Sequence, residues 1–500
     1  DFIIKSLRSY FIDVAGKRSD IILSATIFEK VMGIKMEHRP KSVGAFASNL
    51  SEFESFRDFL TSATLTTLID LPFLIIFISV IYMLGGSLAF IPLAVLPLAV
   101  LAGIAVQKPL KNTINELFKF SAQKNATLVE SLNNLDSIKS TGAEGQMQGK
   151  WEQNIGQISR LGLKSRFYSS IAVNTTAFLT QMASICVVVY GVYKISEGEL
   201  TIGALIACTI LTGRALAPVG QVASLLTRYH QARTSLSTLT NMMSLPVERE
   251  PGKKYLHRPT FKGDIEFKNV SFSYPEQPVK ALDNISFKIK SGERVGFIGR
   301  IGSGKSTIEK LMLGMYEPQE GSILIDGTDI RQIDPSDLRR QIGYVPQDIS
   351  LMFGSVKDNI TMGSRYADDA SILHAAEIAG VTQFVNRHPE GFDMPAGEHG
   401  ASLSGGQRQS VAVARSLLLT PPIYIMDEPS NSMDNSTEAR FKEKFLEQLH
   451  KQTLILVTHR ASLLSLVDRL IVMDGSKIMA DGSKDKVLEA LKKGQIKVSN

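Results

Sequence analysis

Long uncharged stretches dominate the first half of the chain. No Asp, Glu, Lys or Arg occurs between Asp70 and Lys108. This run is too long for one membrane-spanning helix, which needs about 20 apolar residues, but it suits two. The glycines and serine at 85–87 are a turn signal within it. The pattern therefore predicts two spans, near 60–84 and 88–106.

A second apolar pair follows the same plan. Residues 171–193 carry no charge, a short polar turn follows, and residues 201–226 are apolar except for Arg214. Buried helices of a large soluble core are the alternative, but four long runs paired by tight turns favour a membrane domain. A charge within a span is costly, so Arg214 either lines a translocation path or is bonded to carbonyls or an acid. Asp70 is interpreted as an interfacial residue or a helix cap.

The distribution of positive charge predicts the orientation. Segments 1–60 and 107–168 are rich in Lys and Arg, whereas the turns at 85–87 and 194–200 have almost none. Because cytoplasmic segments carry the excess of Lys and Arg, the long segments are expected in the cytoplasm. The apolar positions of 107–168 recur with helical spacing, which predicts helices that continue beyond the membrane.

The pattern changes in the second half. Residues 242–262 combine Pro and Gly with charges, which is typical of an exposed tether. Alternation then predicts an antiparallel sheet from residue 264 onward, and short apolar runs at 422–426 and 453–457 predict buried strands between helices. We therefore expect a membrane domain at 1–241, a linker at 242–262 and an α/β domain at 263–500.

Composition narrows the possibilities further. The net charge of +6 is modest for 500 residues, and no basic run is interleaved with aromatic residues, which argues against nucleic-acid binding. Cys186 and Cys208 both lie in apolar stretches. We expect them to be buried packing residues, not a disulfide or a zinc site.

The most informative stretch is 299–306, a glycine-rich turn ending in Lys305 and Ser306 between an apolar strand and a helix start. This arrangement is typical of a phosphate-binding loop, in which glycines let backbone N–H groups face a phosphate. The lysine reaches the terminal phosphates of the nucleotide, and the hydroxyl offers an oxygen to Mg²⁺. We therefore predict binding of a nucleoside triphosphate.

Polar residues follow the later predicted strands. Asp427 suits the role of holding Mg²⁺, and Glu428 suits that of the general base for the attacking water. His459 could bond the terminal phosphate. The Ser-Gly-Gly run at 404–406 opens a predicted helix, where N–H groups can hold a second phosphate.

Together with the phosphate loop, the motif Leu403-Ser404-Gly405-Gly406-Gln407-Arg408-Gln409 resembles the signature of the ATP-binding cassette (ABC) transporters. The resemblance implies an all-α exporter membrane domain joined to an α/β phosphate-loop ATPase, with ATP and Mg²⁺ as cofactors. It places each ATP between the phosphate loop of one chain and residues 404–406 of the other, and so implies a homodimer.

The resemblance also assigns roles to particular residues. Tyr274 resembles the aromatic that stacks on adenine, Gln347 the loop glutamine that meets Mg²⁺, and His459 the switch histidine. Glu398 and the segments 107–168 and before Glu52 resemble parts that join membrane domain and motor. The expected nucleotide-binding residues are Tyr274, Gly299, Arg300, Ile301, Gly302, Ser303, Gly304, Lys305, Ser306, Thr307, Ser404, Gly405 and Gly406; the catalytic ones are Glu428, His459 and Lys305; the metal ligands are Ser306, Gln347 and Asp427.

Two departures from the family pattern stand out. Four spans are predicted where such half-transporters have six, so two further helices are expected before residue 1. In the loop that crosses the dimer interface, residues 431–433 are Asn-Ser-Met where Ser-Ala-Leu types are commoner, although Asp434 is retained.

Short sequence segments of the membrane domain resemble those of the type I protein secretion transporters of Gram-negative bacteria. Examples are residues 11–17, 53–59 and 213–218. This implies a multi-pass inner-membrane protein with a cytoplasmic motor, a periplasmic adaptor, an outer-membrane channel and an unfolded protein as substrate. A lipid or drug exporter would share every motor residue. A soluble ATPase with the same cassette is a third possibility, opposed by the uncharged pairs.

Overall fold

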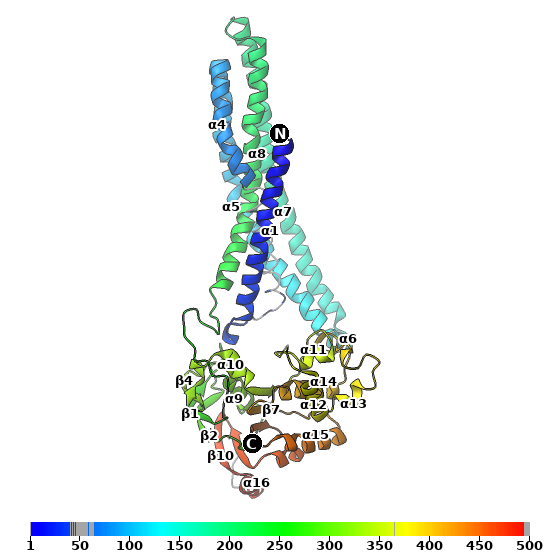
Figure 1. Cartoon of the computed structure of the whole chain (residues 1–500). Helices are drawn as coiled ribbons and strands as arrows, with labels where there is room; N and C mark the ends of the chain where they lie inside the picture. Colours follow the sequence, from blue (N-terminus) through cyan, green and yellow to red (C-terminus); the bar gives the residue numbers. More distant parts are fainter. Residues whose placement is uncertain are drawn as a thin grey trace. The chain divides into compact units, whose positions relative to one another are not determined.

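The structure is a computed structural model that describes residues 2–40, 42, 44, 46, 59, 65–364 and 366–494. The chain divides into two compact units, each treated separately below (Figure 1). Unit 1 comprises Asp1–Ile34 and His38–Pro246, and unit 2 comprises Lys35–Glu37 and Val247–Asn500. Residues 47–58, which include the residues just before Glu52 in the predicted contact segment, lie outside the described residues, as do residues 60–64 of the first predicted span.

Unit 1 consists of helices joined by short turns in its described residues. Helix α5 packs along α7, while α8 contacts α4, α5 and α7. Small side chains such as Ala99 and Ala183 are buried between these helices, which allows close approach of their backbones. The helices are α1 (Phe2–Met32), α4 (Leu65–Gly85), η3 (Gly86–Ala89), α5 (Phe90–Asn133), α6 (Leu135–Thr141), α7 (Glu144–Ser196) and α8 (Ile202–Met243), and η1 (Met36–His38) follows α1.

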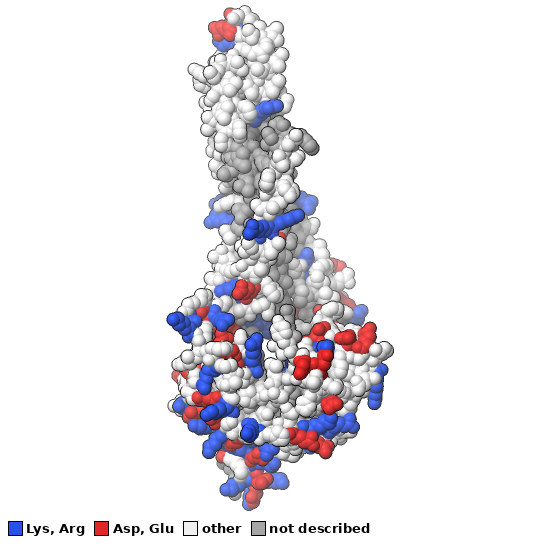
Figure 2. Space-filling view, in the orientation of Figure 1, with Lys and Arg blue, Asp and Glu red and all other residues white. Residues whose placement is uncertain are grey.

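The lengths of α5 and α7 confirm that helix continues through the polar stretch 107–168. They contain 44 and 53 residues, so at about 1.5 Å per residue they measure about 66 and 80 Å. Within the described residues, Pro72–Asn133 and Glu144–Ser196 are long and apolar enough to cross a membrane, and Ile202–Ala217 is a shorter apolar helix. Figure 2 shows few charged side chains over a wide part of this helical unit.

The two predicted turns are confirmed. Helix α4 ends at Gly85, and α7 ends at Ser196, before Thr201 caps α8 by accepting a hydrogen bond from Ala204 N (3.1 Å). The expectation of two buried cysteines is correct for Cys208 but wrong for Cys186, which is exposed on α7.

Arg214 lies on α8 with an exposed side chain. Within the described part of the chain, its guanidinium forms no hydrogen bond or ion pair. The interpretation that Arg214 is bonded to a backbone carbonyl or an acid of the same chain therefore has no support among these residues.

Unit 2 contains the predicted α/β architecture. An antiparallel sheet has the order β2-β1-β4-β5, and a six-stranded sheet has the order β10-β9-β3-β8-β7-β6, with parallel pairing from β9 to β6. The strands are β1 (Ile265–Phe272), β2 (Leu282–Ile289), β3 (Arg294–Gly299), β4 (Glu320–Ile325), β5 (Thr328–Asp329), β6 (Ile342–Val345), β7 (Ile423–Asp427), β8 (Thr453–Val457), β9 (Arg469–Asp474) and β10 (Lys477–Ser483).

Helices cover these sheets and carry the loops of the site. They are α9 (Lys305–Met312), α10 (Pro335–Arg340), α11 (Val356–Ile360), α12 (Asp369–Ala379), α13 (Thr382–Val385), α14 (Gly405–Leu417), α15 (Asn435–Gln448) and α16 (Lys484–Lys492), with η4 (Ile330–Gln332), η5 (Gly391–Asp393), η6 (Glu398–Gly400) and η7 (Ala461–Leu466) between them.

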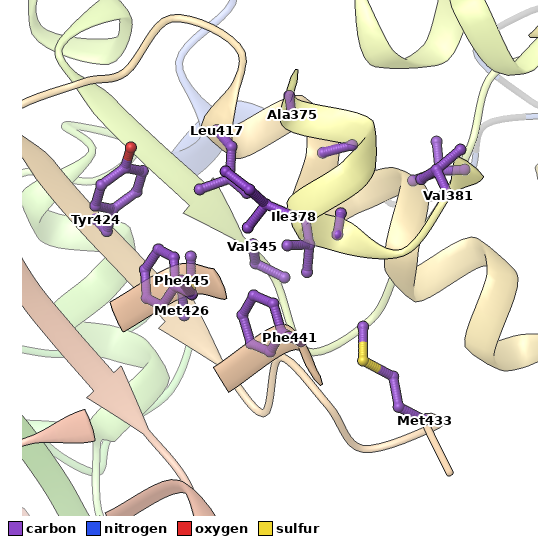
Figure 3. Packing of buried hydrophobic residues seen from close by; sticks show 14 of the residues in the cluster. Val345, Ala375, Ile378, Val381, Leu417, Tyr424, Met426, Met433, Phe441 and Phe445 are labelled. Atoms are coloured by element: carbon purple, nitrogen blue, oxygen red, sulfur yellow. The ribbon is translucent and has the colours of Figure 1, made fainter. Parts of the chain in front are cut away.

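One hydrophobic cluster joins β6 and β7 to α12, α14 and α15 (Figure 3). Phe441 and Phe445 stack with their ring centroids 5.3 Å apart. Met433 is buried and belongs to this cluster. Met433 stands where a leucine is commoner in the family. Because methionine and leucine are both apolar and have similar volumes, a core tolerates this exchange.

The linker prediction is wrong in one respect, because residues 247–262 are not a free tether. Leu256 pairs with Ile333 through its backbone, and Phe261 is buried in the core of unit 2. The Arg339 guanidinium forms a bidentate ion pair with Glu248, at 2.7 and 3.0 Å. The prolines and glycines of this segment correctly predict an irregular backbone. They do not indicate which residues the side chains between them contact.

A short piece from early in the chain also belongs to unit 2. The Lys35 ammonium lies 2.8 Å from a Glu317 carboxylate oxygen and 3.2 Å from one of Glu250. Glu37 accepts a hydrogen bond from the backbone N–H of Glu317 at 3.2 Å. Residues 35–37 are thus held by side-chain and backbone groups that lie more than 200 positions later in the sequence.

Candidate nucleotide-binding site

Strand β3 and helix α9 hold the predicted phosphate loop. At Gly299, with φ of 152°, a Cβ atom would lie 2.1 Å from the Met473 carbonyl oxygen. At Gly304, with φ of 99°, it would lie 2.5 Å from that of Ala281. Only glycine fits both the conformation and the space at these two positions, so the loop can curl tightly before α9 begins at Lys305.

Lys305 is buried and folded back onto its own loop. Its Nζ donates hydrogen bonds to the carbonyl oxygens of Gly299 (2.7 Å) and Arg300 (2.8 Å). Burial lowers the pKa of this ammonium, although Asp427 and Glu428 act in the opposite direction. A polyanionic ligand would favour the charged form by the same Coulombic effect.

Ser306 and Asp427 meet although they are far apart in sequence. The Ser306 hydroxyl donates to Asp427 Oδ2 at 2.9 Å, because α9 begins beside the carboxyl end of β7. Burial and the neighbouring Glu428 raise the pKa of Asp427. Gln347 follows β6, the strand next to β7, and lines the same cleft. Hydroxyl, carboxylate and amide oxygens are ligands that suit Mg²⁺, so the predicted set is chemically coherent.

Glu428 is also held in place by hydrogen bonds. Its backbone is left-handed, with φ of 49°, a conformation that costs energy in a residue with a side chain. Its carboxylate accepts hydrogen bonds from the His459 backbone N–H (2.6 Å) and the Thr458 hydroxyl (3.3 Å). The carboxylate of the predicted base is therefore oriented by the segment that carries the predicted switch histidine.

Tyr274 closes the other end of the cleft. Its ring packs edge-on against Phe272 and Tyr316, with centroids 5.0 and 5.3 Å away, and its hydroxyl lies 3.2 Å from Thr307 Oγ1. The cleft has a volume of about 370 Å³, within the range of small-molecule sites. Its lining includes the predicted residues Tyr274, Ile301, Gly302, Ser303, Gly304, Lys305, Ser306, Thr307, Gln347, Asp427, Glu428 and His459, while Gly299 and Arg300 lead into the loop.

The remaining predicted residues do not join this cleft. Ser404, Gly405 and Gly406 line a second cleft of about 440 Å³, formed by α14, α13 and the loop before α15. Ser404 caps α14 by accepting from Gln407 N (3.3 Å), and the Gln407 side chain accepts from Ser404 N (2.9 Å). The first N–H groups of a helix have no intrahelical acceptor, so those of Gly405 and Gly406 are available to a ligand.

Two buried residues at the site were not singled out from the sequence. Gln409 donates to the Glu428 carbonyl oxygen (2.7 Å) and accepts from Ser432 N (2.8 Å), and so links the two clefts. Glu309 is fully buried on α9, with Tyr344 donating to one oxygen at 3.4 Å. Burial raises the pKa of Glu309 well above its usual value, and Asp427 adds to the shift. Helical spacing from Lys305 and Ser306 could have revealed Glu309, and Gln409 is the last residue of the signature motif, which gave it no role of its own.

Comparisons with known protein families agree with both halves of the chain. The family of the ABC transporter transmembrane region matches residues 1–218. The ABC transporter family matches residues 282–431, which include the phosphate loop, the Ser404 run and Glu428.

Similar curated proteins cover nearly the whole chain. The leukotoxin translocation ATP-binding protein LktB of Mannheimia haemolytica is 33% identical over 98% of this chain and 69% of its own length. The exotoxin translocation ATP-binding protein PaxB of Pasteurella aerogenes gives the same three values. Among solved structures, a bacterial Atm1-family ABC exporter with ATP bound matches 100% of this chain and 89% of its own, with a TM-score of 0.89 and 25% identity.

Proposed function

Because this chain belongs to the ABC transporters, as an ATP-driven exporter half-transporter with one membrane domain and one ATPase domain, we propose that it secretes a protein by type I secretion. The substrate would cross in unfolded form, from a bacterial inner membrane through a periplasmic adaptor and an outer-membrane channel. One observation carries this proposal. The similarity to toxin translocation proteins extends over 98% of the chain, and so includes the membrane unit as well as the ATPase.

The ATPase chemistry follows from the residues of the first cleft. Lys305 leaves its carbonyl partners and binds the terminal phosphates, while the loop N–H groups bind the rest of the chain of phosphates. Glu428 accepts a proton from the attacking water, and His459 contacts the terminal phosphate. Tyr274 stacks on the base.

Mg²⁺ fits the oxygens that the cleft offers. Ser306, Asp427 and, from its loop, Gln347 would hold it, and the bound ion would neutralise phosphate charge. The Ser306–Asp427 hydrogen bond of 2.9 Å already places two of these oxygens together.

A half-transporter must dimerise to supply two of each element. We propose a homodimer in which Ser404, Gly405 and Gly406 of one chain complete the phosphate-loop cleft of the other. The separation of these residues into two clefts of one chain supports this arrangement.

The proteins released by cells test the proposed substrate class. Cells that carry the full-length transporter are compared with cells that carry its Glu428→Gln form, at matched membrane levels. Glu443→Gln, an exposed position on α15 with the same charge change, serves as the control.

If type I secretion is correct, at least one large protein disappears from the medium with Glu428→Gln and remains with Glu443→Gln. Unchanged release would contradict the proposal and would make a lipid or drug exporter the leading candidate.

A further inference from the structure

The second cleft contains a positive charge that the predicted roles do not use. Arg387 follows α13 and lines the cleft together with Ser404, Gly405 and Gly406. Its side chain is exposed, and within the described ranges of the chain its guanidinium has no hydrogen bond or ion pair. A fixed cation at the wall of a donor-rich cleft calls for an anionic partner.

The acidic side chain of the same cleft is already engaged. Asp434 caps α15, and its carboxylate accepts hydrogen bonds from the backbone N–H and hydroxyl groups of Ser436 and Thr437, at 2.6 to 2.9 Å. These hydrogen bonds hold the pKa of Asp434 far below its usual value. Asp434 therefore remains an anion whose charge is met by the start of α15, and it forms no ion pair with Arg387.

The other polar groups of the cleft are mainly donors. They include the N–H groups of Gly405 and Gly406, the Ser404 hydroxyl and the Gln383 amide, all on the lining. A guanidinium offers several N–H groups in a planar fork that matches phosphate oxygens. The ligand that suits this set is a phosphate carried by something outside the chain.

We propose that Arg387 is a further nucleotide-binding residue, whose guanidinium binds a phosphate oxygen of the ATP held by the phosphate loop of the second chain. This inference rests on the proposed site shared between chains. It extends that site from the start of α14 to the segment after α13, which lines the same cleft. Arg387 would thereby sense whether the second chain holds a nucleotide.

A mixed dimer isolates one shared site. Both chains carry Glu428→Gln to prevent hydrolysis, and one chain also carries Lys305→Ala, which disables its own phosphate loop. The intact site then combines the phosphate loop of one chain with the second cleft of the Lys305→Ala chain. The two chains are purified together by two different affinity tags, and binding of radiolabelled ATP is titrated.

The expected ATP affinity depends on which chain of the mixed dimer carries Arg387→Ala. In the Lys305→Ala chain it faces the intact site, and ATP affinity should fall about tenfold, with a smaller loss of about threefold for Arg387→Lys. In the other chain it faces the disabled site, and affinity should stay within about twofold. Arg340→Ala, an exposed arginine on α10 with the same charge change, should have no effect in either chain.

Two results would overturn the inference. Equal losses in both placements would indicate a structural role, and no loss in either would mean that Arg387 does not bind the nucleotide.

Ser404→Arg, placed in the same two ways, separates this failure from failure of the shared site. If Ser404→Arg weakens binding only in the Lys305→Ala chain while Arg387→Ala does nothing, the shared site stands and Arg387 is excluded. If Ser404→Arg is also without effect there, the shared site itself is wrong.

Discussion

The two clefts of unit 2 satisfy their polar groups in opposite ways. In the phosphate-loop cleft, Lys305 binds loop carbonyls, Ser306 binds Asp427, and Glu428 binds the His459 backbone. In the second cleft, the N–H groups that open α14 and the Arg387 guanidinium have no acceptor within the described part of the chain. The first cleft is organised before its ligand arrives, whereas the second presents donors that are available to an incoming anion. This contrast is what the proposed dimer requires, in which a closed site combines one cleft of each kind from different chains.

Of the variants that test this difference between the two clefts, Glu428→Gln should have the largest effect. Loss of a general base should reduce ATP turnover by about 10²- to 10⁴-fold, while ATP affinity stays within about threefold because the phosphate contacts remain. Turnover is measured on the transporter reconstituted in lipid, with Glu443→Gln as the control. Normal turnover would show that the organised cleft holds its base elsewhere.

A second test mixes two defective chains. Lys305→Ala removes the cation of the first cleft, and Ser404→Arg fills the start of α14 in the second. Each homodimer should lose ATP binding at both sites, by about tenfold or more, since a lost charge-assisted contact is worth about 1.5–3 kcal/mol.

The mixed dimer should instead retain one site of normal affinity, made from the two undamaged clefts. Binding stoichiometry measures this directly, with the wild-type dimer as the reference of two sites. Two weakened sites in the mixed dimer would contradict the assignment of the clefts to different chains.

Removal of the Gln409 side chain, which links the two clefts, should have a smaller effect. Gln409→Leu removes the two hydrogen bonds to the Glu428 carbonyl and the Ser432 N–H, which leaves both groups unpaired. Because the first of these bonds fixes the left-handed Glu428 backbone, kcat should fall about tenfold while KM for ATP changes little.

Gln332→Leu, at an exposed position of η4, is the matched control. A change confined to KM would show that Gln409 acts on nucleotide binding and not on the base.

The smallest effect concerns Glu309, behind the first cleft. Its pKa is raised in the folded state, so the folded protein keeps a proton that the unfolded chain releases above its ordinary pKa. Stability from this group is complete below the unfolded pKa and is lost as pH rises toward the folded pKa. Glu309→Gln cannot ionise, so it should become progressively more stable than wild type as pH rises, by up to about 1.4 kcal/mol per pH unit.

Melting temperatures between pH 5 and pH 8 measure this difference, and Glu443→Gln controls for loss of a surface charge. Parallel curves for wild type and Glu309→Gln would mean that Glu309 is ionised in the folded protein.

Local chemistry explains what the sequence could predict. The phosphate loop and the Ser404 capping box use residues within a few positions of one another, and Asp427 ends a recognisable buried strand, so their types and spacing reveal them. Gln409 and Glu309 act through partners 19 to 35 positions away. Helical spacing could place Glu309 on the face of Lys305, and Gln409 ends the signature motif, but the sequence does not indicate which distant groups these two side chains contact.

The same distinction explains the errors. Residues 247–262 look like a tether because their proline and glycine content reports backbone irregularity, but the Leu256–Ile333 bridge depends on a segment that lies far along the chain. Cys186 and Cys208 both lie in apolar helices, and only packing decides which is buried. In a membrane domain an apolar residue can face lipid as well as a core, so hydrophobicity alone does not separate the two.

The contacts of residues 35–37 with unit 2 can form only late in the synthesis of the chain. Lys35 leaves the ribosome 215 residues before Glu250 and 282 residues before Glu317, its two partners. At about 5–20 residues per second, it waits about 10 s to 1 min for them. Helices α4, α5, α7 and α8 are made during that interval. These contacts therefore cannot guide the insertion of those helices, because they form only after α8 has been made and Glu250 and then Glu317 have followed it.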